Sequence, residues 1–110
     1  MVTGVLSYGI IDLPDRIHSY IPIQSTVINT TYKILNDKAF RLYARAHKMN
    51  IFAFRADYKS YLFRASYIRD LDIINSSDIA VIFSGRNSQL CARIVEYCQM
   101  CRKSFLHYYV

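Results

Sequence analysis

Short runs of β-branched and aromatic residues alternate along this chain with longer segments in which apolar residues recur every three to four positions. The first pattern is typical of strands and the second of amphipathic helices. Strands are expected at residues 2–8, 25–29, 51–54, 78–83 and 105–110. Helices are expected from residue 12 to before residue 22, after residue 37, at 65–74 and at 88–103. This alternation predicts βαβ units with right-handed crossovers, and therefore a three-layer α/β fold with about five mostly parallel strands.

The length of 110 residues suits one domain, and no linker, repeat or low-complexity segment divides the chain. We therefore expect a single domain over residues 1–110. A hydrophobic content of 53% with 20% charged residues excludes a disordered chain. No apolar run approaches the ~20 residues of a membrane span. The first residues lack the basic segment and cleavage site of a secretory signal, so we expect no membrane partner and a cytoplasmic protein.

The chain carries a formal net charge of +6, and its basic residues are spread out instead of forming one tract. Two interpretations stay open: a soluble surface with excess lysine and arginine, or affinity for an anionic partner such as nucleic acid or a phosphorylated ligand. The many Tyr, Ile and Asn residues indicate an AT-rich coding sequence, which is a compositional hint of a viral or phage source.

Three cysteines, Cys91, Cys98 and Cys101, fall within one predicted helix. An odd number there does not make a disulfide framework. The pair Cys98 and Cys101 has zinc-ligand spacing, but a zinc site needs four ligands and His107 is the only nearby candidate. We therefore expect small core-facing residues, with no metal and no other cofactor.

Two helices have a predicted apolar face. In the helix after Asp37, which we expect to cap it, the face comprises Ala39, Leu42, Tyr43 and Ala46. In the last helix, it comprises Leu90, Ile94, Tyr97 and Cys101.

Ligands of open parallel sheets bind outside the carboxyl ends of the strands, and four loops of this chain reach that edge. The segment Ser84 to Ser88 is the strongest, because Gly85 permits close approach of a ligand, Arg86 can hold a phosphate, and Ser88 or Asn87 can cap the next helix. An ordinary strand-to-helix turn with capping is the alternative. The expected ligand-binding residues are Ser7, Asn29, Thr30, Asp57, Tyr58, Arg69, Gly85, Arg86 and Ser88.

Catalysis has little support in the residues. His18, His47 and His107 are not paired by spacing with Ser or Cys, and neither a Walker A nor a G-x-G-x-x-G sequence occurs. No catalytic residue is therefore assigned, and we do not expect an enzyme.

From residue 37 onward the order of motifs resembles the YspA/cpYpsA-related SLOG family of small Rossmann-like nucleotide-binding proteins. The segments that carry the resemblance are residues 37–44, 55–58, 67–70, 77–83, 84–88 and 94–98. The resemblance implies a Rossmann-like domain, a nucleotide ligand and, since superfamily members often dimerise, a homo-oligomer. The glycine-rich turn of the family is replaced by residues 29–36, and the Gly-Thr of its last turn by Leu90 and Cys91.

The resemblance gives four hypotheses about function. The first is a non-catalytic binder of a nucleotide or nucleotide-derived signal, which in a virus would sequester a host signal or counter host defence. The second is a degenerate Rossmann-like interaction module that binds and inhibits a host protein or a nucleic-acid-processing enzyme. A residual nucleotide or glycosidic hydrolase ranks third, because the catalytic loop and glutamate of the superfamily's hydrolases are missing. Nucleic-acid binding, by analogy with the DNA-processing protein DprA, ranks last.

Overall fold

The computed structural model describes residues 1–9 and 17–110, and these contain one five-stranded sheet in which every strand pair is parallel. The strands are β1 (Val2–Tyr8), β2 (Val27–Thr31), β3 (Asn50–Phe54), β4 (Ile79–Ser84) and β5 (Ser104–Tyr109). Their order across the sheet is β3-β2-β1-β4-β5. The predicted Rossmann-like α/β architecture is thus confirmed.

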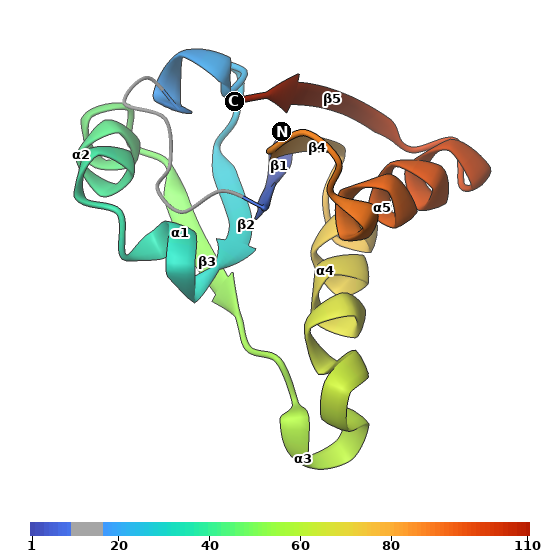
Figure 1. Cartoon of the computed structure of the whole chain (residues 1–110). Coiled ribbons are helices and arrows are strands. Elements are labelled where there is room, and N and C mark those ends of the chain that lie inside the picture. The colour runs from blue at the N-terminus through green and yellow to red at the C-terminus, as the bar shows by residue number, and fades with distance from the viewer. Residues whose placement is uncertain (10–16) are drawn as a thin grey trace.

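Helices cover both faces of this sheet (Figure 1). They are η1 (Ile17–Tyr20), α1 (Tyr32–Leu35), α2 (Lys38–Ala46), α3 (Tyr58–Tyr61), η2 (Leu62–Arg64), α4 (Ala65–Asn75) and α5 (Gln89–Met100). In Figure 1, α1 and α2 lie on one side of the sheet, α4 and α5 lie on the other, and α3 projects away from the rest of the chain. Residues 12–16 of the helix expected from Asp12 lie outside the described residues, and Ile17–Tyr20 forms the 3-10 helix η1.

The core is divided into two by the sheet, because successive strand residues point to opposite faces. On the face covered by α2, Val5 and Phe83 pack against Phe40. On the face covered by α4 and α5, Leu6 packs with Ile73 and Ile94, and all three are buried. Central strands buried on both faces explain the almost continuous apolar sequence of residues 79–83.

The apolar face predicted for α2 is wrong except at Tyr43, which packs against the core. Asp37 caps the helix as expected, accepting a hydrogen bond from the Phe40 backbone N–H at 2.8 Å. The buried residues are Phe40 and Ala44, whereas Leu42 is exposed. The large ring of Phe40 buries more apolar surface than the alanines of the predicted stripe, so it sets which side of the helix faces the sheet.

Two further details differ from the expectations. The buried face of α5 consists of Cys91, Ile94 and Cys98, while Leu90 is exposed. The second strand begins at Val27 instead of residue 25 and continues through Thr31. Its parallel pairing with β1 aligns Val2 with Val27, so Ser25 precedes the sheet, and the expected binding residues Asn29 and Thr30 lie within the strand.

The chain reverses its direction across the sheet between β1 and β4, which makes this the topological switch point. Two loops are held together there. The Gly85 backbone N–H donates to the Tyr8 carbonyl at 2.9 Å. Gly9 has a φ of +64°, and a β-carbon on it would lie 3.5 Å from that of Ser88. Among the helices of the described residues, none has both the length and the apolar character needed to cross a membrane.

Candidate functional site

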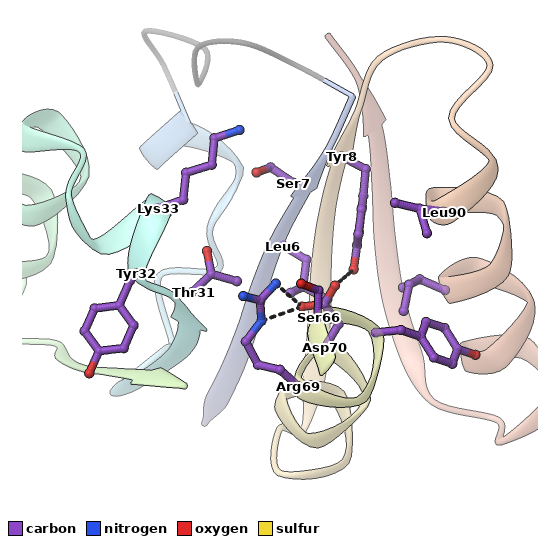
Figure 2. Close-up of a pocket in the computed structure, with 12 residues that line it drawn as sticks. Leu6, Ser7, Tyr8, Thr31, Tyr32, Lys33, Ser66, Arg69, Asp70 and Leu90 are labelled. Atoms are coloured by element: carbon purple, nitrogen blue, oxygen red, sulfur yellow. Dashed lines mark hydrogen bonds and ion pairs between the residues drawn. The ribbon is translucent and has the colours of Figure 1, made fainter. Parts of the chain in front are cut away.

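A cavity of about 290 Å³ opens at the carboxyl ends of β1 and β2, beside the switch point. We call it the switch-point cavity. Its volume is close to the lower end of the range for small-molecule sites, roughly 300–1,000 Å³. Figure 2 shows its side chains arriving from β1, α1, α4 and α5. The lining residues are Leu6, Ser7, Tyr8, Thr31, Tyr32, Lys33, Ser66, Tyr67, Arg69, Asp70, Leu90 and Ile94.

A hydrogen-bonded group of three side chains forms one wall of this cavity (Figure 2). The Tyr8 hydroxyl donates to Asp70 Oδ2 at 2.6 Å. Arg69 Nε donates to Asp70 Oδ1 at 3.0 Å, and Arg69 Nη2 lies 3.0 Å from the same oxygen. The side chain of Asp70 is 6% exposed and that of Arg69 is 20% exposed. Asp70 therefore anchors both neighbours from the interior, and the guanidinium of Arg69 stays in reach of a ligand.

Burial governs the protonation of this group. Burial raises the pKa of Asp70, and the hydrogen bond from Tyr8 and the charge of Arg69 oppose that rise. Burial also raises the pKa of Tyr8, and the Asp70 charge raises it further. Tyr8 therefore remains a hydroxyl that donates to Asp70, and it does not supply a phenolate for chemistry.

Basic and aromatic side chains also line the switch-point cavity. Lys33 and Tyr32 come from α1, and Tyr67 comes from α4. Tyr32 and Arg69 also border a shallower hollow that includes Phe54, Arg55, Ala56 and Tyr58. The Arg55 guanidinium lies 5.2 Å from the centre of the Tyr32 ring, and its Nε donates to the Tyr32 hydroxyl at 3.3 Å. This arrangement suits a ligand with both an anionic group and a planar ring.

The structure places only some of the expected binding residues at this cavity. Ser7 and Arg69 line it, and Tyr58 borders the adjoining hollow, where its hydroxyl lies 2.8 Å from Ser66 Oγ. Asp57 is exposed and caps α3, accepting from the Ser60 backbone N–H.

Asn29 and Thr30 lie within β2 and make internal contacts. The Asn29 side-chain amide donates to the Ser76 carbonyl at 3.1 Å. The Thr30 hydroxyl donates to the Val5 carbonyl at 2.7 Å. Both side chains are buried and stabilise the packing of the strand.

The residues of the turn after β4 do not line the switch-point cavity. Gly85 and Ser88 line a second cavity of about 410 Å³, and Ser88 caps α5. Arg86 borders a separate, open hollow with Asn87 and Tyr109. The turn therefore combines ordinary helix capping with a cavity of its own.

We call this second cavity the edge cavity, because it lies between α5 and the edge strand β5. Its lining residues are Ser84, Gly85, Asn87, Ser88, Cys91, Ala92, Val95, Glu96, Gln99, His107 and Tyr109. Ser84 Oγ and Cys91 Sγ lie 2.7 Å and 3.3 Å from His107 Nε2.

Tyr8, Asp70 and Lys33 were not among the expected binding residues, and the Ser84–Cys91–His107 cluster was not predicted. Tyr8 is the last residue of the first predicted strand and adjoins Ser7, and Asp70 adjoins Arg69, so each lies beside a predicted residue. Because Tyr8 and Asp70 are 62 positions apart in the sequence, spacing along the chain does not indicate that they are in contact.

Comparison of the chain with family models, with curated proteins and with solved structures found no match. Within residues 1–9 and 17–110, no three His, Cys, Asp or Glu side chains are grouped so that they could hold a metal ion.

Proposed function

We propose that the chain binds a nucleotide or nucleotide-derived signal in the switch-point cavity, without chemical conversion. The observation that carries the proposal is the position of Arg69, whose guanidinium is fixed by Asp70 in a cavity at the switch point of a parallel sheet. The resemblance of residues 37–98 to Rossmann-like nucleotide-binding proteins of the SLOG family agrees with this ligand class.

Arg69 has donors left for an anion. Its Nε and Nη2 both contact one oxygen of Asp70, Oδ1. Among the described residues, none accepts a hydrogen bond from Nη1. A phosphate oxygen can therefore bind Nη1 while Asp70 holds the other side of the guanidinium. Lys33 adds a second positive charge to the cavity, and the rings of Tyr32 and Tyr67 provide surfaces for a base.

Thermal unfolding of the whole chain with AMP, ADP, NAD⁺ or cyclic di-AMP tests the proposal. A ligand at a hundredfold excess over its Kd stabilises the folded state by about 2.7 kcal/mol, which raises the Tm of a domain of this size by about 10 °C. We expect such a rise with at least one of these compounds. No rise with any of them would contradict nucleotide binding.

The variant Arg69→Ala tests whether the stabilising compound binds in the switch-point cavity. It should weaken binding of the stabilising compound by about 10- to 100-fold, because a charge-assisted hydrogen bond contributes roughly 1.5–3 kcal/mol. Arg93→Ala is the matched control, since Arg93 is an exposed arginine on α5 that lines neither cavity. Each variant is compared with its own unliganded Tm. Equal weakening by both substitutions would indicate nonspecific attraction to the basic surface.

In a virus, a binder that leaves its ligand intact would act by sequestering a host signal, and we propose this role for the chain. The hint of a viral source in the composition supports it. Expression of the chain should lower the free concentration of the bound nucleotide in cells, whereas Arg69→Ala should not.

A second candidate function, an interaction module that inhibits a host protein, is favoured by the tip formed by α3 and η2. Here Tyr58, Tyr61, Leu62 and Phe63 are 59%, 48%, 66% and 88% exposed. Exposed aromatic side chains are typical of interface hot spots. A photoreactive residue at position 63 should crosslink such a partner, whereas one at position 52, another exposed phenylalanine on β3, should not.

A further inference from the structure

Three side chains from three elements meet at the wall of the edge cavity. Ser84 is the last residue of β4, Cys91 lies in the first turn of α5, and His107 lies on β5. Both Ser84 Oγ, at 2.7 Å, and Cys91 Sγ, at 3.3 Å, lie within hydrogen-bond distance of His107 Nε2. A nucleophile within reach of an imidazole nitrogen is the basic arrangement of thiol and hydroxyl catalysis.

The register of the sheet explains why these residues meet. β4 and β5 pair in parallel, with Ile82 opposite His107 and Ser84 opposite Tyr109. Ile82 belongs to the core beneath α4 and α5, so His107 points to the same face. Ser88 caps α5 by accepting from the Cys91 backbone N–H at 3.2 Å, which fixes the thiol over that face.

The edge cavity is suited to a substrate without negative charge. Among the described residues, its lining contains no lysine or arginine, and the one carboxylate there is Glu96. Its other polar groups are hydroxyls, amides and the imidazole. A phosphorylated compound would meet no cation in this lining, whereas a neutral ester or amide finds hydrogen-bond partners there.

We propose that Cys91 is a nucleophile and His107 its general base, and that together they accept an acyl group from an uncharged ester or amide. His107 Nε2 takes the thiol proton while Cys91 Sγ forms a bond to the acyl carbon. The bond between that carbon and the leaving oxygen or nitrogen then breaks, and the leaving group takes the proton from His107. The product is a thioester on Cys91 and a free alcohol or amine.

Cys91 is a better nucleophile than Ser84, because a thiol loses its proton more readily than a hydroxyl. Burial raises the pKa of the Cys91 thiol, so the resting group keeps its proton. A buried thiol of this kind is inert unless a base removes the proton during attack. Reactivity at Cys91 would therefore depend on His107.

The two other cysteines provide internal controls. Cys101 is exposed, and Cys98 is buried with a pKa raised to about 11. Without a general base, Cys101 should react fastest. With His107 as the base, Cys91 should react faster than Cys101 despite being 3% exposed.

The experiment treats the full-length chain with p-nitrophenyl acetate at pH 7 and maps acetyl groups by mass spectrometry of proteolytic peptides. We expect acetyl-Cys91 to form at least 10-fold faster than acetyl-Cys101. His107→Gln should slow acetylation of Cys91 by about 100-fold, which is the lower end of the range for general base catalysis. The acetylation rate of Cys101 should stay unchanged. Cys101→Ser should leave the Cys91 rate unchanged.

Faster acetylation of Cys101 than of Cys91 in the unaltered chain would overturn the proposal, and so would an acetyl group on Ser84 instead of Cys91. The first comparison needs no variant, so it holds even where His107→Gln fails to fold. Arg93→Ala should not change the Cys91 rate, because Arg93 lines neither cavity. Acetylation of Cys91 and the nucleotide-dependent rise in Tm are separate measurements, so failure of this proposal is distinguishable from failure of nucleotide binding.

Discussion

The switch-point cavity and the edge cavity both use α5 as a wall, yet their chemistry differs. Leu90 and Ile94 border the first cavity, while Ala92 and Val95 border the second. The first contains Arg69 and Lys33, whereas the described residues that line the second include no cation. One helix can therefore separate an anion-binding region from a neutral one, because residues one position apart point in different directions.

The hydrogen-bonded side chains of the two cavities also differ in chemistry: the first group is centred on a carboxylate and the second on an imidazole. In the switch-point cavity, Asp70 is the shared acceptor for a hydroxyl and a guanidinium, which suits it to hold a ligand in place. In the edge cavity, His107 Nε2 lies within hydrogen-bond distance of a hydroxyl and a thiol. A cationic wall favours binding, whereas an imidazole beside a thiol favours proton transfer.

The largest expected effect comes from Ile94→Ala, which enlarges the switch-point cavity at its α5 wall. Ile94 is fully buried, so we expect a loss of about 3 kcal/mol in the free energy of unfolding. Val95→Ala, on the edge-cavity side, removes a half-buried side chain and should lose less than half as much. Urea denaturation measures both, and equal losses would show that the two walls of α5 are packed alike.

A smaller effect is expected from Tyr8→Phe, which removes the hydroxyl that donates to Asp70. Loss of a hydrogen bond to a charged group should lower the free energy of unfolding by about 2 kcal/mol and weaken ligand binding at the switch-point cavity. Tyr109→Phe is the control, because that ring is 66% exposed at the edge cavity. Urea denaturation measures both variants. A comparable loss in the free energy of unfolding would show that the Tyr8 hydroxyl contributes no more than an exposed one.

Ser84→Ala should have a smaller effect again. It removes one neutral hydrogen bond to His107, so we expect a loss of about 1 kcal/mol in the free energy of unfolding. Nucleotide affinity, measured by calorimetry, should stay the same because Ser84 does not line the switch-point cavity. A change in that affinity would show that the two cavities are coupled through α5.

The smallest effect is expected from titration of Asp70, because the hydrogen bond from Tyr8 and the charge of Arg69 offset part of the burial. The pKa of Asp70 is raised in the folded chain, so the folded state binds its proton more tightly than the unfolded chain. The stability that Asp70 contributes should therefore fall as pH rises from the ordinary carboxyl pKa through the raised one.

Asp70→Asn provides the reference for this measurement, since an amide does not titrate in that range. The free energy of unfolding of the unaltered chain minus that of Asp70→Asn should fall between pH 3 and pH 7. A rise over the same range would mean that Arg69 and Tyr8 outweigh burial and lower the pKa of Asp70.

The fold could be predicted from the sequence because its signals are local. Residues 2–8 form the predicted first strand, and Ala65–Asn75 extends the predicted helix by one residue. The buried face of α2 was missed because residue size, as well as spacing, decides which side of a helix packs. Phe40 is completely buried, and the predicted stripe omitted it.

The sites could be predicted only in part, because they depend on contacts between distant residues. The rule for parallel sheets predicts a site at the carboxyl ends of the strands, and the structure has a cavity there that Arg69 and Ser7 help to line. The pairing of His107 with Ser84 follows from the register of β5 against β4, which spacing along the chain does not contain. Sequence spacing gave no link between His107 and a nucleophile, whereas the folded chain provides two.

The central position of β1 has a consequence for how the chain folds. Its partner on one side, β2, begins at Val27, but its partner on the other side begins only at Ile79. One edge of β1 therefore finds its strand partner only in a segment more than 70 residues further along the chain. Such long-range pairing slows folding, and a similar separation in sequence divides Tyr8 from Asp70.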